Sequence, residues 1–308
     1  MTSDIYRRFE GLVPSDGHPL WNQSYYFNAY DPVTRTGCFL RLGFMEEQAC
    51  CNSWLVVFRD GKPLFQRSNA ALPYTPLRPL DGVELDGLRV EVEEPLQKAR
   101  VRFASRELDF DLLWEGLQPL QDSIALSADE DGAFAEDIAH AHLEGTCRVT
   151  GTVRQRDGAI LPFEGKGGRD IAAGPRDWGA LAHYRIAFPI FDDGMTLIGI
   201  HGIADGGRHA YMRMLHDGTA WHKIARLDDE LLFDADDMTV RTTRWTAELA
   251  DGRNWTVEGR TLFRAFIPHD GFMLAEHMAE FTRDDGATGY GLIECGYRFP
   301  WSGNGNPD

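Results

Sequence analysis

The dipeptide Asp-Gly occurs twelve times along the 308 residues, and short segments of alternating polar and apolar residues lie between its copies. Both residues tolerate positive φ, so the dipeptide favours the tight turns that join antiparallel strands. Alternation is clearest in the segments 88–92, 101–103, 108–112, 211–214 and 238–243. A period of two gives strands with one wet face and one dry face. The sequence therefore predicts an all-β protein made of antiparallel β-barrels or sandwiches.

Helical patterns are scarce. Residues 127–137 and Leu227 to Asp237 each predict a loop or one short helix, and no strand–helix–strand rhythm is present.

The length predicts two domains, at about 100–200 residues per domain. A weak repeat agrees, because Asp157-Gly158 and Asp251-Gly252 are each followed at the same spacing by an apolar residue, Glu and Gly. A glycine-rich stretch at 165–179 is the expected junction. We therefore expect an N-terminal domain over 1–168 and a C-terminal domain over 169–308.

The formal net charge is −17, which argues against a nucleic acid or an anionic membrane surface as a partner. No run of about 18 apolar residues predicts a membrane span, and the N-terminus lacks the apolar region of a signal peptide. The cysteines are odd in number and form no CxxC motif, which favours a reduced, cytoplasmic setting: Cys38, Cys50, Cys51, Cys147 and Cys295. A homodimer is compatible with the sequence, which does not fix the oligomeric state.

The glycine-rich stretch carries two Arg-Asp pairs, Arg169-Asp170 and Arg176-Asp177, followed by Trp178. Glycine lets the backbone turn sharply or approach a ligand closely, and an Asp beside an Arg stays ionised. The stretch predicts either a ligand site or a salt-bridged corner between the domains. It lacks the spacing of a phosphate-binding loop.

A second polar group is His140, His142 and Glu144. On a strand these three residues share one face. They could bind zinc, supply acid–base groups, or be ordinary polar residues of an exposed strand.

Aromatic residues gather between His18 and Asp31. Trp21, Tyr25 and Phe27 offer the apolar surface that a ligand cavity needs, and they suit a plain core equally well. Further along, His201, His277 and Glu294 interrupt apolar strands. A buried imidazole or carboxyl needs a partner, so these residues are candidates for core networks or for acid–base work.

Four segments together resemble one known family: Asn22–Asn28, Leu143–Val153, Gly168–Trp178 and Tyr290–Glu294. The chain resembles the AttH-like superfamily, which includes carotenoid 1,2-hydratases (hydroxyneurosporene synthases). The resemblance implies two lipocalin-like β domains and a hydrophobic cavity. It also implies protonation of alkenes for hydration, or steered cyclisation of polyenes, with no metal or organic cofactor.

The chain departs from this family at one motif. The family reads Arg-Asp-His-x-Trp-Gly, and here Ile171, Ala172 and Ala173 follow Arg169-Asp170. The missing His and Trp are the groups we interpret as the acid and the cation stabiliser. Either the chemistry is carried by Asp170, His201 or another group, or the protein binds its ligand without that reaction.

We therefore expect an acid–base enzyme (a hydratase or dehydratase, isomerase or cyclase) acting on an isoprenoid-, steroid- or polyketide-like molecule. Asp170 is the expected acid, oriented by Arg169 and Arg176, with His201 as a further catalytic candidate. The expected substrate-binding residues are Trp21, Tyr25, Phe27, Glu144, Asp177, Trp178, Tyr184, His277, Tyr290 and Glu294. A lipophilic-ligand carrier is the alternative. A metal enzyme using His140, His142 and Glu144 is a third hypothesis, which we rank below a site without metal.

Overall fold

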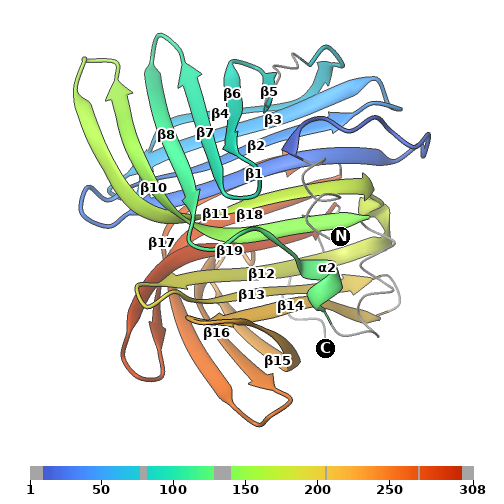
Figure 1. Cartoon of the computed structure of the whole chain (residues 1–308), viewed down its shortest axis with the longest axis vertical. Coiled ribbons are helices and arrows are strands. Elements are labelled where there is room, and N and C mark those ends of the chain that lie inside the picture. Colours follow the sequence, from blue (N-terminus) through green and yellow to red (C-terminus); the bar gives the residue numbers. More distant parts are fainter. Residues whose placement is uncertain (1–9, 77–81, 128–139, 205–206, 270, 300–308) are drawn as a thin grey trace. The chain divides into compact units, whose positions relative to one another are not determined.

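The computed structural model describes residues 10–76, 82–127, 140–204, 207–269 and 271–299, without the side chain of Trp178. The chain divides into two compact units (Figure 1). Unit 1 consists of Met1–Asp122 and Ala139–Arg176, and unit 2 of Ser123–Ile138 and Asp177–Asp308.

Nearly all of the regular structure is β-strand. The strands are β1 (Trp21–Asp31), β2 (Thr36–Met45), β3 (Cys50–Arg59), β4 (Lys62–Pro73), β5 (Gly82–Leu85), β6 (Leu88–Glu94), β7 (Lys98–Ala104), β8 (Leu108–Gly116), β9 (Gln121–Asp122), β10 (Ala141–Gln155), β11 (Ile160–Pro175), β12 (Leu181–Phe191), β13 (Met195–Ala204), β14 (His209–Asp217), β15 (Trp221–Phe233), β16 (Val240–Leu249), β17 (Asn254–His269), β18 (Phe272–Arg283) and β19 (Thr288–Arg298). The described helices are α2 (Ser123–Leu126) and the 3-10 helix η2 (Trp178–Ala180). None of them is long and apolar enough to cross a membrane.

Unit 1 is built on one antiparallel sheet of eleven strands, in the order β4-β3-β2-β1-β11-β10-β8-β7-β6-β5, with β9 paired to β10. Alternate residues of these strands form one hydrophobic core. Phe27 and Trp114 are both buried in this core, with their ring centroids 5.2 Å apart in an edge-to-face arrangement.

Unit 2 is a closed barrel, in which each strand from β12 to β19 pairs with the next and β19 pairs with β12. Closure removes the unpaired edges that an open sheet presents. Phe191, Leu197, Trp245 and Phe281 fill the interior. The two units confirm the expected all-β tandem fold.

The prediction of a loop or short helix at Leu227 to Asp237 was wrong, because β15 runs through this segment to Phe233. Leu227 and Leu231 alternate as a strand requires, but a charged residue, Asp229, stands between them on the same face. The charge of Asp229 interrupts the apolar alternation, so the sequence pattern did not predict a strand here. Most of the other expected loop, 127–137, lies outside the described residues.

The glycine-rich stretch is part of a regular strand. Strand β11 pairs with β1 on one side and with β10 on the other. A Cβ atom at Gly165 would lie 2.2 Å from the carbonyl oxygen of Tyr30, and one at Gly167 would lie 1.8 Å from that of Asn28. Glycine is therefore required there for close approach of the β1 backbone. The boundary expected between residues 168 and 169 falls inside this strand.

Two of the Asp-Gly dipeptides form the tight hairpin turns predicted for them. Asp60-Gly61 joins β3 to β4 and Asp86-Gly87 joins β5 to β6, with all four residues at positive φ. These are two-residue hairpins whose turns match the twist of the strands.

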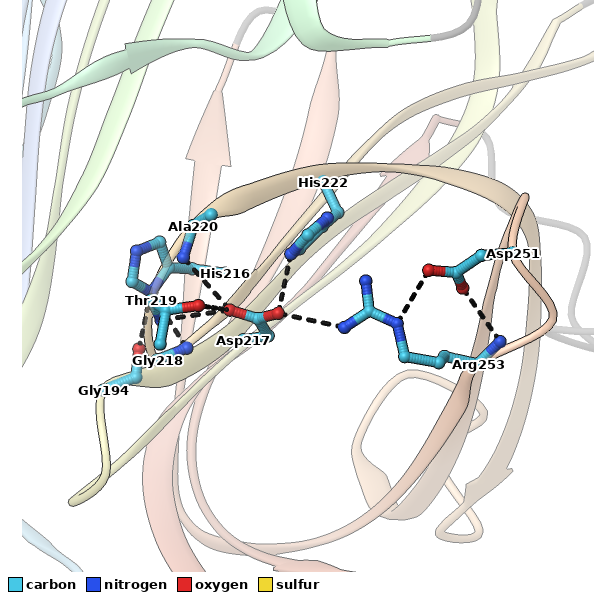
Figure 2. Close-up of polar contacts among 9 residues, drawn as sticks. All are labelled: Gly194, His216, Asp217, Gly218, Thr219, Ala220, His222, Asp251 and Arg253. Atoms are coloured by element: carbon cyan, nitrogen blue, oxygen red, sulfur yellow. Dashed lines mark hydrogen bonds and ion pairs between the residues drawn. The ribbon is translucent and has the colours of Figure 1, made fainter.

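Asp217 organises the turn between β14 and β15 (Figure 2). Its Oδ1 accepts hydrogen bonds from the Thr219 hydroxyl (2.6 Å) and from the backbone N–H groups of Thr219 and Ala220 (both 3.0 Å). These donors, the Thr219 hydroxyl first, outweigh desolvation and hold the pKa of Asp217 well below its usual range.

The same carboxylate connects this turn to a second Asp-Gly turn. Asp217 Oδ2 accepts hydrogen bonds from His222 Nε2 (2.7 Å) and Arg253 Nη1 (3.1 Å), and Arg253 Nε donates to Asp251 (2.8 Å; Figure 2). The Asp-Gly residues at 217 and 251 thus stabilise two hairpins at once.

Candidate acid–base site

Three ionisable side chains share one face of unit 1 where β10 pairs with β11. Asp170 lies directly opposite Glu144, and His142 is two residues from Glu144 on the same strand. Strand alternation therefore places His142, Glu144 and Asp170 on the same face. Their side chains are 8%, 4% and 23% exposed.

His142 lies between the two carboxylates. Its Nε2 is 3.1 Å from Asp170 Oδ2, and its Nδ1 is 3.9 Å from Glu144 Oε2. Burial and the charge of Arg176 disfavour the imidazolium, but the charges of Glu144 and Asp170 outweigh them and raise the pKa of His142 to about 9. The ring is therefore a cation at neutral pH and donates its Nε2 proton to Asp170.

The second oxygen of Asp170 lacks a hydrogen-bond partner among the described residues. This atom, Oδ1, is also buried. A buried carboxylate oxygen is costly to leave unpaired, so this atom is suited to accept a proton or a hydrogen bond from a bound molecule.

Arg169 does not orient Asp170. Its guanidinium points to the opposite face of β11, where it forms a buried ion pair with Glu10 and lies 5.8 Å from the Phe27 ring centroid. Arg176 is half-buried, and its charge acts on His142. Of the two arginines predicted to support Asp170, only Arg176 influences this group.

The predicted substrate-binding residues of this region also lie in different surroundings. Tyr25 and Phe27 face the core of unit 1 rather than the His142 face. Trp21 is buried and packs edge-to-face on His140, with ring centroids 6.0 Å apart. Asp177 is exposed. The side chain of Trp178 lies outside the described residues.

The His142 group could also hold a metal ion. One ligand atom from each of His142, Glu144 and Asp170 lies within 4.8 Å of the other two. His140, predicted as a third ligand, is exposed and lies 3.8 Å from Asp16 instead. The structure thus replaces His140 with Asp170 in the candidate ligand set.

Unit 2 holds a second polar group, around His201. Asp229 Oδ1 lies 2.6 Å from His201 Nδ1, and Asp229 Oδ2 accepts a hydrogen bond from Arg185 Nη1 at 2.7 Å. His209 Nδ1 lies 2.7 Å from His201 Nε2. Sequence reasoning found His201 and missed its three partners. A charged residue on the apolar face of a strand, as Asp229 is, was the signal that could have found them.

The remaining predicted residues take part in separate contacts of unit 2. The Tyr184 hydroxyl donates to Glu294, and the Tyr290 hydroxyl lies 3.4 Å from Glu280. His277 lies in the core. Its Nδ1 donates to the Ile293 carbonyl (3.1 Å), its Nε2 accepts from a backbone N–H group (3.1 Å), and burial lowers its pKa to about 4. Both of its ring nitrogens are thus engaged by the backbone.

The family described as Domain of unknown function (DUF7064) matches residues 13–298 of the chain. A search of curated proteins found no match.

Solved structures share the fold at low identity. An AttH protein of Nitrosomonas europaea superposes with a TM-score of 0.65 at 14% identity, covering 96% of this chain and 95% of that one. CghA with Sch210972 gives 0.64 at 14% identity, with 94% of each chain covered. Kievitone hydratase from Nectria haematococca gives 0.59 at 11% identity, covering 90% of this chain and 88% of that one. At such identities the likeness shows the fold alone, and it confirms the AttH-like fold expected from the sequence.

Proposed function

The chain belongs to the DUF7064 family, and from that premise we propose that it is an acid–base enzyme acting on a hydrophobic small molecule without an organic cofactor. The reaction is a hydration or dehydration, an isomerisation or a cyclisation. One of the similar structures is a hydratase and another is of a protein with a small molecule, which supports this class of reaction.

The observation that carries the proposal is the pairing of His142 with Asp170. A protonated imidazole is hydrogen bonded to one carboxylate oxygen, while the other oxygen is buried without a partner. When the reaction removes a proton from the substrate, Asp170 Oδ1 accepts that proton. By microscopic reversibility the same Oδ1–H returns a proton to carbon.

The neighbours of Asp170 suit this role. The His142 imidazolium stabilises the carboxylate at each moment when the proton is on the substrate, and Glu144 keeps the imidazole charged. Where the AttH-like motif has His, this chain has Ile171, whose side chain faces the core of unit 1. An imidazole nevertheless lies beside Asp170, because strand β10 supplies His142. This supports acid–base chemistry despite the altered motif.

A carrier without catalysis is the second candidate. The apolar residues at positions 171 and 173 favour it, since the groups expected to donate a proton and stabilise a cation are absent there.

The five cysteines are free, and four of them are buried, which supports our placement of the protein in a reducing compartment such as the cytoplasm.

Ligand capture followed by turnover tests the proposal. The protein is incubated with a lipophilic extract of its source cells, and bound and released molecules are identified by mass spectrometry. We expect a product that differs from its precursor by one water, or an isomer of equal mass. Asp170→Asn and His142→Gln should slow its formation by about 10²–10⁴-fold, whereas His140→Gln, an exposed neighbour, should not. Ligand recovered unchanged from the wild-type protein would establish the carrier instead.

A further inference from the structure

The polar group inside the barrel of unit 2 is built around a buried carboxylate. The side chains of Arg185, His201 and Asp229 are 6%, 7% and 4% exposed. They come from three strands, β12, β13 and β15, and lie on the inward-facing positions of those strands. His209, on β14, is exposed. The group therefore extends from the barrel interior to its surface.

The hydrogen bonds fix most of the proton positions. Desolvation raises the pKa of Asp229, but the hydrogen bonds from His201 and Arg185 and the charge of Arg185 outweigh it and hold that pKa below its usual range. Asp229 is thus a carboxylate, and His201 Nδ1 must carry the proton between them. The 2.7 Å contact of His201 Nε2 with His209 Nδ1 then holds one proton, shared by two nitrogens.

We propose that Asp229, His201 and His209 form a proton relay, a second acid–base centre that takes a proton from a small carbon or oxygen acid at the mouth of the barrel. The proton leaves the substrate for His209 Nε2, while the Nδ1 proton of His209 moves to His201 Nε2. The substrate is left as its anion, and His201 becomes an imidazolium whose Nδ1–H remains on Asp229. One proton enters the relay, and no other reactant is required.

The surroundings of His201 differ from those of His142. Asp229 is already neutralised by Arg185, whereas His142 lies between two carboxylates. Among the described residues, the other titratable or charged groups beside the relay are His183 on β12, Tyr211 and Arg213 on β14, and Cys295 and Tyr297 on β19. Burial, and then the charge of Arg185, lower the pKa of His183 to about 4, so this neighbour adds no positive charge at neutral pH. The charge of Asp229 is thus balanced by that of Arg185.

The ring contacts keep the relay aligned. Tyr211 stacks on His201 with ring centroids 4.5 Å apart, and the guanidinium of Arg213 lies 5.0 Å from the Tyr211 ring. Stacking fixes the plane of the imidazole, and Asp229 fixes its tautomer. Asp229 therefore acts as a positioning residue, while His209 is the group that touches the substrate.

Imidazole nitrogen-15 NMR of the wild-type protein tests the resting state. We expect His201 to hold its proton on Nδ1, and Asp229→Asn to disturb that tautomer. A wild-type His201 protonated mainly on Nε2 would overturn the relay, and no variant has to fold for this result.

Proton abstraction from 5-nitrobenzisoxazole tests the function. Its C–H proton passes to the base as the N–O bond breaks, giving a coloured cyanophenolate. We expect the wild-type protein to exceed an equal concentration of free imidazole by at least about 10-fold. His201→Gln, His209→Gln and Asp229→Asn should each remove most of that excess.

His222→Gln is the matched control, since it alters another carboxylate-paired histidine of the same barrel, and it should keep the rate. A rate equal to that of free imidazole, or one unchanged in Asp229→Asn, would overturn the proposal, because His209 would then be an ordinary exposed histidine. His140→Gln, at an exposed histidine of unit 1, should also keep this rate. Turnover of the captured ligand, measured separately, distinguishes failure of the relay from failure of the function proposed above.

Discussion

Arg169 and Asp170 are consecutive residues whose side chains lie on opposite faces of strand β11. Arg169 enters the core of unit 1 and pairs with Glu10, while Asp170 lies beside His142 on the other face. One residue therefore serves the interior of the fold and the next serves the candidate site. The two should respond to mutation in different ways.

Loss of Glu10 should destabilise unit 1 strongly. Glu10→Ala leaves the Arg169 guanidinium buried without its carboxylate, at an expected cost of about 3–5 kcal/mol. The double variant Glu10→Ala with Arg169→Met should recover part of this loss, because no buried charge remains. Urea denaturation followed by hydrogen exchange of β10 and β11 measures both. Equal destabilisation of the single and double variants would contradict this account of the pair.

The stability of unit 1 should fall as the pH rises from 7 to 10. A pKa of about 9 in the folded state, against an ordinary 6.5, means that the charged His142 stabilises the fold below pH 6.5 and that this stabilisation is lost as the pH rises through 9. The effect should reach about 3 kcal/mol at most. Urea denaturation at several pH values measures it.

His142→Gln should abolish this pH dependence, whereas His140→Gln should retain it. An unaltered slope in His142→Gln would show that other groups are responsible.

Much of the fold could be predicted because turn chemistry and alternation act locally. Asp60-Gly61 and Asp86-Gly87 adopt the positive φ values that their residue types allow, and the alternating segments are strands. Strand β11 was not predicted from the sequence, because glycine usually weakens strands. Here Gly165 and Gly167 are needed for close contact with β1, a long-range requirement that no local pattern reveals.

The candidate sites were predictable in part for the same reason. Period-two alternation on β10 placed His142 and Glu144 together, but Asp170 joins them only through the pairing of β10 with β11. His201 stood out in an apolar strand, whereas His209 contacts it from the neighbouring strand β14 and Asp229 from the next strand, β15. Contacts between strands depend on register, which the sequence of one strand does not contain.

Removal of the Asp217 carboxylate should loosen the hairpin between β14 and β15. Asp217→Ala removes the acceptor for Thr219, His222 and Arg253, so the free energy of unfolding of unit 2 should fall by about 1–2 kcal/mol at neutral pH. Because the pKa of Asp217 is held below its ordinary 3.8, its contribution is present above that pH and is lost as the pH falls further. Thermal unfolding at pH 7 and below pH 4 measures both effects.

Asp228→Ala is the matched control. Its side chain is 53% exposed and pairs with an Arg226 side chain that is 69% exposed, so its loss should change stability by less than about 0.5 kcal/mol. Similar losses in the two variants would contradict a special role for Asp217.

The His142 group should hold a proton rather than a metal ion. His142 turns Nε2 towards Asp170 and Nδ1 towards Glu144, so the two carboxylates contact different ring nitrogens. A tetrahedral zinc site needs one nitrogen near both carboxylates, with ligand atoms about 3.3 Å apart. Chelation with EDTA should therefore leave turnover of the captured ligand unchanged, and added Zn²⁺ should bind no more tightly to the wild-type protein than to His142→Gln in calorimetry. One zinc per chain in elemental analysis, lost in Asp170→Asn but kept in His140→Gln, would show that His142, Glu144 and Asp170 are metal ligands instead.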